Sequence, residues 1–169
     1  ACCCSMPKVA PLDRKIDPMK LMGNWYVQRA VPTPFDRTAH NGLEQYTCDD
    51  AKKRVGVKYS FNNGSFTGAT TTVFQTGRVH PKSSNGTLWQ VAPWLGVCYL
   101  PFWLDYVIID VDPASFMVCS SPSTTGMGAW MYIMTRDQIV TDKVLEPLSA
   151  TAAKAGWDMS ASVRVPHQK

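Results

Sequence analysis

The sequence predicts an all-β protein, an eight-stranded antiparallel up-and-down β-barrel with one C-terminal α-helix packed outside it and a short final strand. Three observations support this fold class. Short segments of alternating apolar and polar residues follow one another, separated by turns rich in the 12 Pro and 11 Gly. A Gly-x-Trp sequence, Gly23-Asn24-Trp25, opens the first segment, and Arg136 ends the eighth. Helical spacing occurs only once, near the C-terminus.

Length and composition predict a single domain. A chain of 169 residues with 45% hydrophobic and 18% charged residues buries a sizeable core without help. We expect an N-terminal arm over residues 1–15 and one barrel domain over residues 16–169. Asp17 and Pro18 have the residue types of an N-cap and a first helical position, and predict one short turn before the barrel. No basic and apolar leader opens the chain, so we expect that any targeting segment has been removed.

Alternation then defines the strands in order. In the third strand Val55, Val57, Tyr59 and Phe61 share one face. Asn63-Gly64 and Asn85-Gly86 each fit a hairpin turn better than a glycosylation site. The eight expected strands are Trp25–Ala30, Leu43–Asp49, Arg54–Phe61, Thr70–Val79, Thr87–Pro93, Tyr106–Asp112, Ser115–Ser121 and Ala129–Arg136.

Residues 83–104 carry no charge, so a transmembrane helix over Leu88–Leu104 has to be considered. Pro93 and Pro101 would break such a helix. A strand followed by an aromatic loop at the barrel rim fits better. Exposed apolar patches of this kind usually contact a ligand, a partner or a membrane. The loop contributes Trp94, Leu95, Tyr99, Phe102 and Trp103.

The C-terminal part predicts a helix that Thr141-Asp142 opens and Ala155-Gly156 ends, with Gly156 as its C-cap. Pro147 lies too far inside for a first-turn proline, so we expect a kink or a regular part that begins near Glu146. Met159–Val165 is expected to form the final short strand.

These features in this order resemble the lipocalin family. The similarity covers about residues 16–166 and points to the subgroup of bacterial lipocalins, apolipoprotein D and the plant temperature-induced and chloroplast lipocalins. It rests on Met22-Gly23-Asn24-Trp25-Tyr26, Tyr106-Val107-Ile108-Ile109-Asp110 and Tyr132-Ile133-Met134-Thr135-Arg136. The resemblance implies structural roles for Gly23, Trp25, Asp110 and Arg136, with the Arg136 guanidinium packed across the Trp25 ring and bonded to the N-terminal arm.

The six cysteines lack the spacing of a zinc site, so we expect no metal and interpret them as disulfide-forming. The resemblance to apolipoprotein D implies a bridge from one of Cys2, Cys3 and Cys4 to Cys119, which we assign to Cys4. Cys48 and Cys98 would form the other pair. Disulfides imply an oxidising extracytoplasmic compartment, whether secreted, periplasmic or membrane-anchored, with the thylakoid lumen as an alternative.

Charge and motif content exclude several functions. A net charge of +4, with no basic run longer than Lys52-Lys53-Arg54, gives no footprint of nucleic-acid binding. No nucleophile lies near a base at motif spacing, and the histidines His40, His80 and His167 fit surface positions. We therefore expect no enzyme activity. A reactive cavity thiol at Cys48 or Cys98 is the alternative.

An eight-stranded barrel has room for one small ligand. Its apolar, aromatic interior suits a lipid, because each buried methylene contributes about 0.8 kcal/mol. Arg29 and Lys58 are candidates to meet an anionic head group. Val27 shares a strand face with Trp25, and Trp130 and Tyr132 share one with Arg136, so these residues point inward if the Trp25–Arg136 pair does. On the other strands the more apolar or aromatic face is chosen. The predicted ligand-binding residues are Val27, Arg29, Val57, Tyr59, Phe74, Trp89, Tyr106, Ile108, Trp130 and Tyr132.

The resemblance implies a monomeric or weakly dimeric carrier or scavenger of a small hydrophobic molecule. The candidates are a fatty acid, lysophospholipid, sterol, retinoid or carotenoid, with no cofactor besides such a bound lipid, carotenoid or retinoid. Two alternatives remain open. One is a structural subunit that docks on a membrane complex, such as a photosynthetic one, through the aromatic loop at residues 94–103. The other is a lipocalin-fold enzyme that modifies a lipid or pigment.

Overall fold

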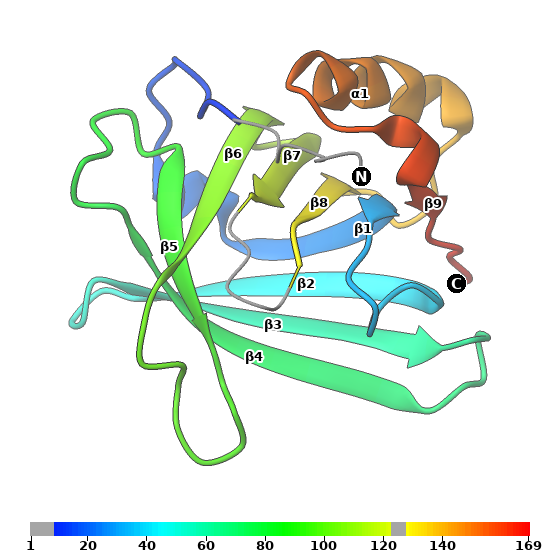
Figure 1. Ribbon diagram of the computed structural model, residues 1–169, viewed down its shortest axis with the longest axis horizontal. Helices are drawn as coiled ribbons and strands as arrows, with labels where there is room; N and C mark the ends of the chain where they lie inside the picture. Colours follow the sequence, from blue (N-terminus) through cyan, green and yellow to red (C-terminus); the bar gives the residue numbers. More distant parts are fainter. Residues whose placement is uncertain (1–8, 123–127) are drawn as a thin grey trace, which may run out of the picture.

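The computed structural model describes residues 9–122 and 128–169, and these form a closed antiparallel barrel. Figure 1 shows the barrel with helix α1 on its outside. Sequential strands pair as neighbours from β2 to β8, and β1 pairs with both β8 and β2, which closes the barrel. The strands are β1 Gly23–Val31, β2 Ala39–Asp49, β3 Arg54–Asn63, β4 Thr70–Val79, β5 Leu88–Pro93, β6 Leu104–Asp112, β7 Phe116–Ser121, β8 Trp130–Thr135 and β9 Val163–Arg164.

The predicted fold class is therefore confirmed, and differences lie at strand ends. β2 begins at Ala39 rather than at Leu43, because an irregularity between His40 and Leu43 breaks the alternation that the sequence pattern relies on. Asn41 adopts a left-handed φ of 52° at this point. The predicted turn after Asp17 is a 3-10 helix, η1 Pro18–Leu21, and the Asp17 side chain accepts a hydrogen bond from the Met19 amide.

Helix α1 Asp142–Lys154 lies against the outer face of β6, β7 and β8. Pro147 stays inside the helix, so the predicted shortening to Glu146 does not occur. The prediction of a strand over Met159–Val165 is wrong for most of this segment. Asp158 caps a second 3-10 helix, η2 Met159–Ala161, by accepting from the Ser160 amide, and only β9 is extended. In residues 9–122 and 128–169 no helix combines the length and hydropathy needed to cross a bilayer.

The barrel wall separates two apolar clusters. The larger cluster fills the interior and includes Trp25, Trp89 and Tyr106. The smaller cluster lies between the wall and α1, where outward residues such as Ile109 and Met131 meet helix residues such as Leu145. Burial of both faces of β6, β7 and β8 explains why these strands contain near-continuous apolar runs.

One end of the barrel is closed by Trp25 and Arg136. The Arg136 guanidinium carbon lies 3.6 Å from the centroid of the Trp25 ring, the contact that the sequence predicts. Its three nitrogens donate to the backbone carbonyls of Pro113, Asn24 and Lys20. The Trp25 indole donates to the Leu21 carbonyl at 2.8 Å and is fully buried. This end is therefore sealed by a cation–π contact and by bonds to three chain segments.

The C-terminal segment fills a gap in the wall. The first half of β1 pairs with β2, but its second half leaves β2 and pairs with β9, with Arg29 opposite Arg164. Beyond β9 the Val165 amide donates to the Gln28 carbonyl, and the Asn41 amide donates to the Pro166 carbonyl. Residues 163–168 thus bond to β1 on one side and to β2 on the other.

Replacement of Trp25 by Ala is expected to lower the free energy of unfolding by about 3–5 kcal/mol, because it removes a fully buried aromatic side chain and leaves a cavity. Denaturant unfolding measures the change. Trp94→Ala serves as the control, since Trp94 is 40% exposed in the β5–β6 loop, and its cost should stay below about 1 kcal/mol. Equal losses in the two variants would contradict the sealing role of Trp25.

Candidate functional site

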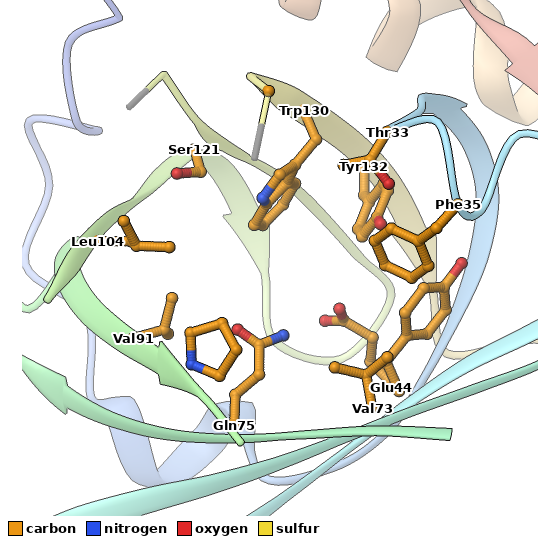
Figure 2. A pocket seen from close by; sticks show the side chains of 13 residues that line it. Thr33, Phe35, Glu44, Val73, Gln75, Val91, Leu104, Ser121, Trp130 and Tyr132 are labelled. Atoms are coloured by element: carbon orange, nitrogen blue, oxygen red, sulfur yellow. The ribbon is translucent and has the colours of Figure 1, made fainter. Parts of the chain in front are cut away.

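A cavity opens at the end of the barrel opposite Trp25. Its volume is about 60 Å³, counted as the space that the centre of a water molecule can occupy, within a hollow of about 600 Å³ that includes open solvent. The loop between β1 and β2, which contributes Thr33 and Phe35, forms one side of its mouth. Figure 2 shows side chains from opposite walls pointing toward one another across it. The cavity is lined by Thr33, Phe35, Glu44, Tyr59, Val73, Gln75, Val91, Pro93, Leu104, Ser121, Gly128, Trp130 and Tyr132.

Aromatic rings make up most of the deeper wall. Trp130 and Tyr132 stack with centroids 4.6 Å apart, and Tyr59 lies 5.6 Å from Tyr132. Tyr106 meets Trp130 edge-on at 5.5 Å and stacks on Trp89. These rings fill the middle of the barrel, so the cavity is confined to the open end and suits a small ligand.

Two buried carboxylates interrupt this aromatic surface. Glu44, on β2, is 1% exposed, and its Oε2 accepts a hydrogen bond from the Tyr46 hydroxyl at 2.6 Å. The Tyr46 and Tyr106 hydroxyls are also hydrogen-bonded to each other. Asp36, in the β1–β2 loop, accepts from the hydroxyls of Thr33 and Tyr132 on its two oxygens. Asp36 thereby ties the loop at the mouth to β8.

The burial of Glu44 changes its acidity. Loss of solvent raises the pKa of Glu44 to about 7; the hydrogen bond from Tyr46 opposes this, and the nearby charge of Asp36 adds to it. Burial also raises the pKa of the Tyr46 and Tyr106 hydroxyls well above the ordinary value. Glu44 is therefore the group at this site that changes charge near neutral pH.

Most of the predicted ligand-binding residues do face the barrel interior. Tyr59, Trp130 and Tyr132 line the cavity itself. Five others belong to the buried interior cluster, beneath or beside the cavity: Val27, Val57, Trp89, Tyr106 and Ile108. Their contact with a ligand stays a prediction.

The assignments of Phe74 and Arg29 to the cavity are wrong. Phe74 is 47% exposed, because Val73 and Gln75 occupy the inward positions of β4. A β-bulge between Val27 and Arg29 shifts the register of β1, so Arg29 points outward and donates to the Ser162 hydroxyl. Lys58, the other expected head-group contact, is exposed as well.

The cysteines also differ from expectation. Cys48 and Cys98 are free and exposed, so the structure does not join them, and neither lines the cavity as a reactive thiol. The Cys48 thiol instead donates to the Asp50 carboxylate at 3.3 Å. Cys119 is a buried free thiol on the inner face of β7, and burial raises its pKa well above the usual value. Its proposed partner Cys4 lies outside the described residues.

The aromatic loop between β5 and β6 begins and ends beside the cavity, at Pro93 and Leu104, and four of its five predicted apolar residues are exposed: Trp94, Leu95, Tyr99 and Phe102. Trp94 and Tyr99 form an isolated bridge, and the Trp94 amide donates to the Phe74 carbonyl on β4. Trp103 lies between the guanidinium groups of Arg54 and Arg78, at 4.7 and 4.3 Å, on the outer face of β3 and β4. Leu95 and Val97 remain exposed, at 52% and 86%.

Three polar residues at or beside the cavity are absent from the set predicted from the sequence: Glu44, Gln75 and Asp36. The predicted set contains no residue of β2, whereas the period of two places Glu44 and Tyr46 on the inner face of this strand. The shared face of Glu44 with Tyr46 was the available signal. Asp36 lies in a loop, where strand periodicity gives no information. Within residues 9–122 and 128–169, no three His, Cys, Asp or Glu side chains gather to hold a metal ion.

Comparison with known proteins agrees with this architecture. A family model described as a lipocalin-like domain matches residues 16–167. No curated protein matches the sequence. The structure is similar to insecticyanin from the tobacco hornworm Manduca sexta, with a TM-score of 0.75, 14% identity, and 98% of this chain and 87% of that chain covered.

Two further solved structures share the fold at low identity. The amine-binding protein of Rhodnius prolixus, solved as a tryptamine complex, has a TM-score of 0.69 and 13% identity over 93% of this chain and 84% of its own. Lobster apocrustacyanin A1 has a TM-score of 0.64 and 15% identity over 98% of this chain and 94% of its own.

The raised pKa of Glu44 predicts how the free energy of unfolding changes with pH. Between about pH 4.5 and 7 the folded protein keeps a proton that the unfolded chain has released, so the contribution of Glu44 to stability falls as pH rises. At roughly 1.4 kcal/mol per pKa unit, the loss is on the order of 3 kcal/mol. Relative to Glu44→Gln, the unmodified protein should lose this amount between pH 5 and 8.

Denaturant unfolding at several pH values measures the difference. Glu146→Gln is the matched control, because it removes the same charge from an exposed position on α1. Parallel stability curves for Glu44→Gln and the unmodified protein would show that Glu44 titrates normally.

Proposed function

Because the chain belongs to the family of lipocalin-like domains, we propose that it binds a small, largely apolar molecule in the cavity at the open end of the barrel and carries or sequesters it. Members of this family are generally binding and transport proteins. The observation that carries the proposal is the cavity itself, a solvent-connected hollow lined by aromatic and aliphatic side chains with few polar groups.

The aromatic filling of the barrel limits the size of the ligand. Trp89 and Tyr106 occupy the space below the cavity and are 1% and 3% exposed, so a ligand that extends below the open end, such as a long alkyl chain or a sterol, would have to displace them. The proposed ligand is therefore a compact molecule of a few rings or a short alkyl chain, bound at the open end. The amine-binding protein of Rhodnius prolixus, with its tryptamine ligand, provides a precedent for a ligand of this size in a barrel of this fold.

The charge of the cavity disfavours an anionic ligand. In residues 9–122 and 128–169, the side chains that line the cavity include no Lys, Arg or His. Arg29 and Lys58, once candidates for an anionic head group, lie on the outside of the barrel. A fatty acid would therefore bind with its carboxylate in the solvent at the mouth, since Glu44 repels it from inside.

A second candidate function is attachment to a lipid surface through the β5–β6 loop. Leu95 and Val97 are exposed apolar residues at the tip of this loop, and Arg54 and Arg78 lie beside its base. Apolar tips with neighbouring basic groups suit a bilayer that contains anionic lipids. This function is compatible with ligand binding, because the loop tip is not part of the cavity lining.

Ligand binding is tested by a substitution in the cavity wall that fills the cavity with a larger side chain. Val73 and Phe74 are adjacent on β4, and only Val73 faces the cavity. We expect the unmodified protein to bind the fluorescent probe N-phenyl-1-naphthylamine. Val73→Trp should weaken this binding at least tenfold because the indole occupies the cavity, whereas Phe74→Trp should not.

Probe titration followed by fluorescence measures both affinities, and unfolding curves check that both variants fold. Equal affinity in the two variants would place the probe elsewhere on the protein. No probe binding at high micromolar concentration would contradict a binding function for the cavity.

The lipid-surface candidate is tested with vesicles of phosphatidylcholine and phosphatidylserine. Leu95→Ser combined with Val97→Ser should reduce co-sedimentation several-fold, since it removes the exposed apolar tip. The same variant should bind the naphthylamine probe normally. Unchanged or absent co-sedimentation in both proteins would exclude this loop as a membrane contact.

A further inference from the structure

We infer that the cavity selects ligands that carry a protonated amine and that the Glu44 carboxylate is their counter-ion. This inference rests on the binding function proposed above and names the chemical class of the ligand. Four features of the described residues support it: the accessible oxygen of Glu44, the absence of an internal cation, the surrounding aromatic faces and the differing roles of the two buried acids.

The first feature is the geometry of Glu44. Its side chain extends from the middle of β2, where it is paired with Tyr59 of β3, into the lower part of the cavity. Figure 2 shows its carboxylate directed into the space between Gln75 and Tyr132. The Tyr46 hydroxyl occupies Oε2, and no hydrogen bond from residues 9–122 and 128–169 reaches Oε1. One oxygen is thus held in place and the other is free for a ligand.

The second feature is the lack of a protein cation. Among the described residues, no Lys, Arg or His nitrogen lies within 4 Å of the Glu44 or Asp36 carboxylates. A buried, unpaired carboxylate costs several kcal/mol, so proteins usually pair such a group or keep it protonated. A cationic ligand supplies the missing partner and recovers this cost on binding.

The two acids have different roles, which is the third feature. Both Asp36 oxygens accept hydrogen bonds, from Thr33 and from Tyr132, so Asp36 is already used in holding the β1–β2 loop. It still adds negative charge near Glu44. The pair therefore attracts a cation to the inner end of the cavity, and Glu44 is the acid with a free oxygen to receive it.

The fourth feature is the aromatic surround. Tyr59, Trp130 and Tyr132 line the cavity next to Glu44, and Phe35 covers its mouth. Aromatic faces attract ammonium groups, and the attraction is strongest when these groups are desolvated. The same rings stack on an apolar ligand body. A short aromatic or alkyl amine satisfies both parts of the site at once.

The inference also sets the pH dependence of binding. Burial raises the pKa of Glu44 to about 7, so its charge develops as the pH rises through neutrality. Asp36 adds a nearby negative charge. The other titratable groups that face Glu44 from the surrounding elements have pKa values raised by burial and stay neutral in this range. They are Tyr46 on β2, Tyr59 on β3, Tyr106 on β6, Cys119 on β7 and Tyr132 on β8. Amine affinity should therefore increase with pH.

The test compares 2-phenylethylamine with 2-phenylethanol, which have nearly the same shape and differ in charge. Each compound is titrated against the bound N-phenyl-1-naphthylamine, and its affinity is measured by displacement of this probe between pH 5.5 and 8.5. In this range 2-phenylethylamine remains protonated. At pH 8 we expect the amine to bind at least tenfold more tightly than the alcohol. This preference should shrink toward pH 5.5, while the affinity for the alcohol changes little.

Variants assign the preference to Glu44. Glu44→Gln keeps the acceptor for the Tyr46 hydroxyl and nearly the same volume, so it should lose the preference for the amine, measured as the ratio of the two affinities at pH 8. Glu146→Gln removes the same charge from the exposed surface of α1 and should behave like the unmodified protein.

The outcomes distinguish a failure of the cation assignment from a failure of the binding function. If the naphthylamine probe binds the unmodified protein and the amine and the alcohol bind equally, the cation assignment is wrong and the binding function stands. If Glu44→Gln retains the full amine preference, Glu44 is not the counter-ion. If the probe does not bind the unmodified protein at all, the binding function itself fails.

Discussion

Closure of the barrel depends on how β1 divides its hydrogen bonds. A single strand has two edges, yet β1 pairs with β2, β8 and β9. One edge pairs with β8 from Tyr26 to Val31, across the bulge between Val27 and Arg29. The other edge pairs first with β2 and then with β9. Trp25, before the bulge, seals one end under Arg136. The interior, and with it the position of every cavity residue, follows from this one strand.

The cavity combines two requirements that oppose each other. Stability favours an interior filled by rings such as Trp89 and Tyr106, and these do fill the middle of the barrel. Binding requires an unfilled space and polar groups that the apolar core cannot satisfy. Glu44 is placed where the two regions meet, with one oxygen satisfied from the packed side by Tyr46 and the other directed at the open side. The energetic cost of burying this acid is consistent with a site kept for a ligand.

The sequence predicts the fold well because strand alternation and turn residues are local patterns that survive folding, and the resemblance to the lipocalin family implies the long-range contact of Arg136 with Trp25. The site is predicted less well, since on most strands the inward face was chosen by apolarity. The face shared with Arg136 correctly places Trp130 inside, and apolarity succeeds for Tyr59. Apolarity fails on β4, whose outward face carries Phe74, and it overlooks the polar Glu44 on the inner face of β2. The bulge that reverses Arg29 depends on pairing with β8, which no local pattern reveals.

The insertion of residues 163–168 between β1 and β2 has a consequence for solubility. Where two strands diverge, each presents unpaired amide and carbonyl groups that resemble the edge of an open sheet, and such edges recruit strands from other molecules. Here the backbone of Val165 and Pro166 occupies these groups from within the same chain. The segment thus acts as a built-in guard against intermolecular strand addition, and its detachment would expose a template for domain swapping or aggregation at the seam of the barrel.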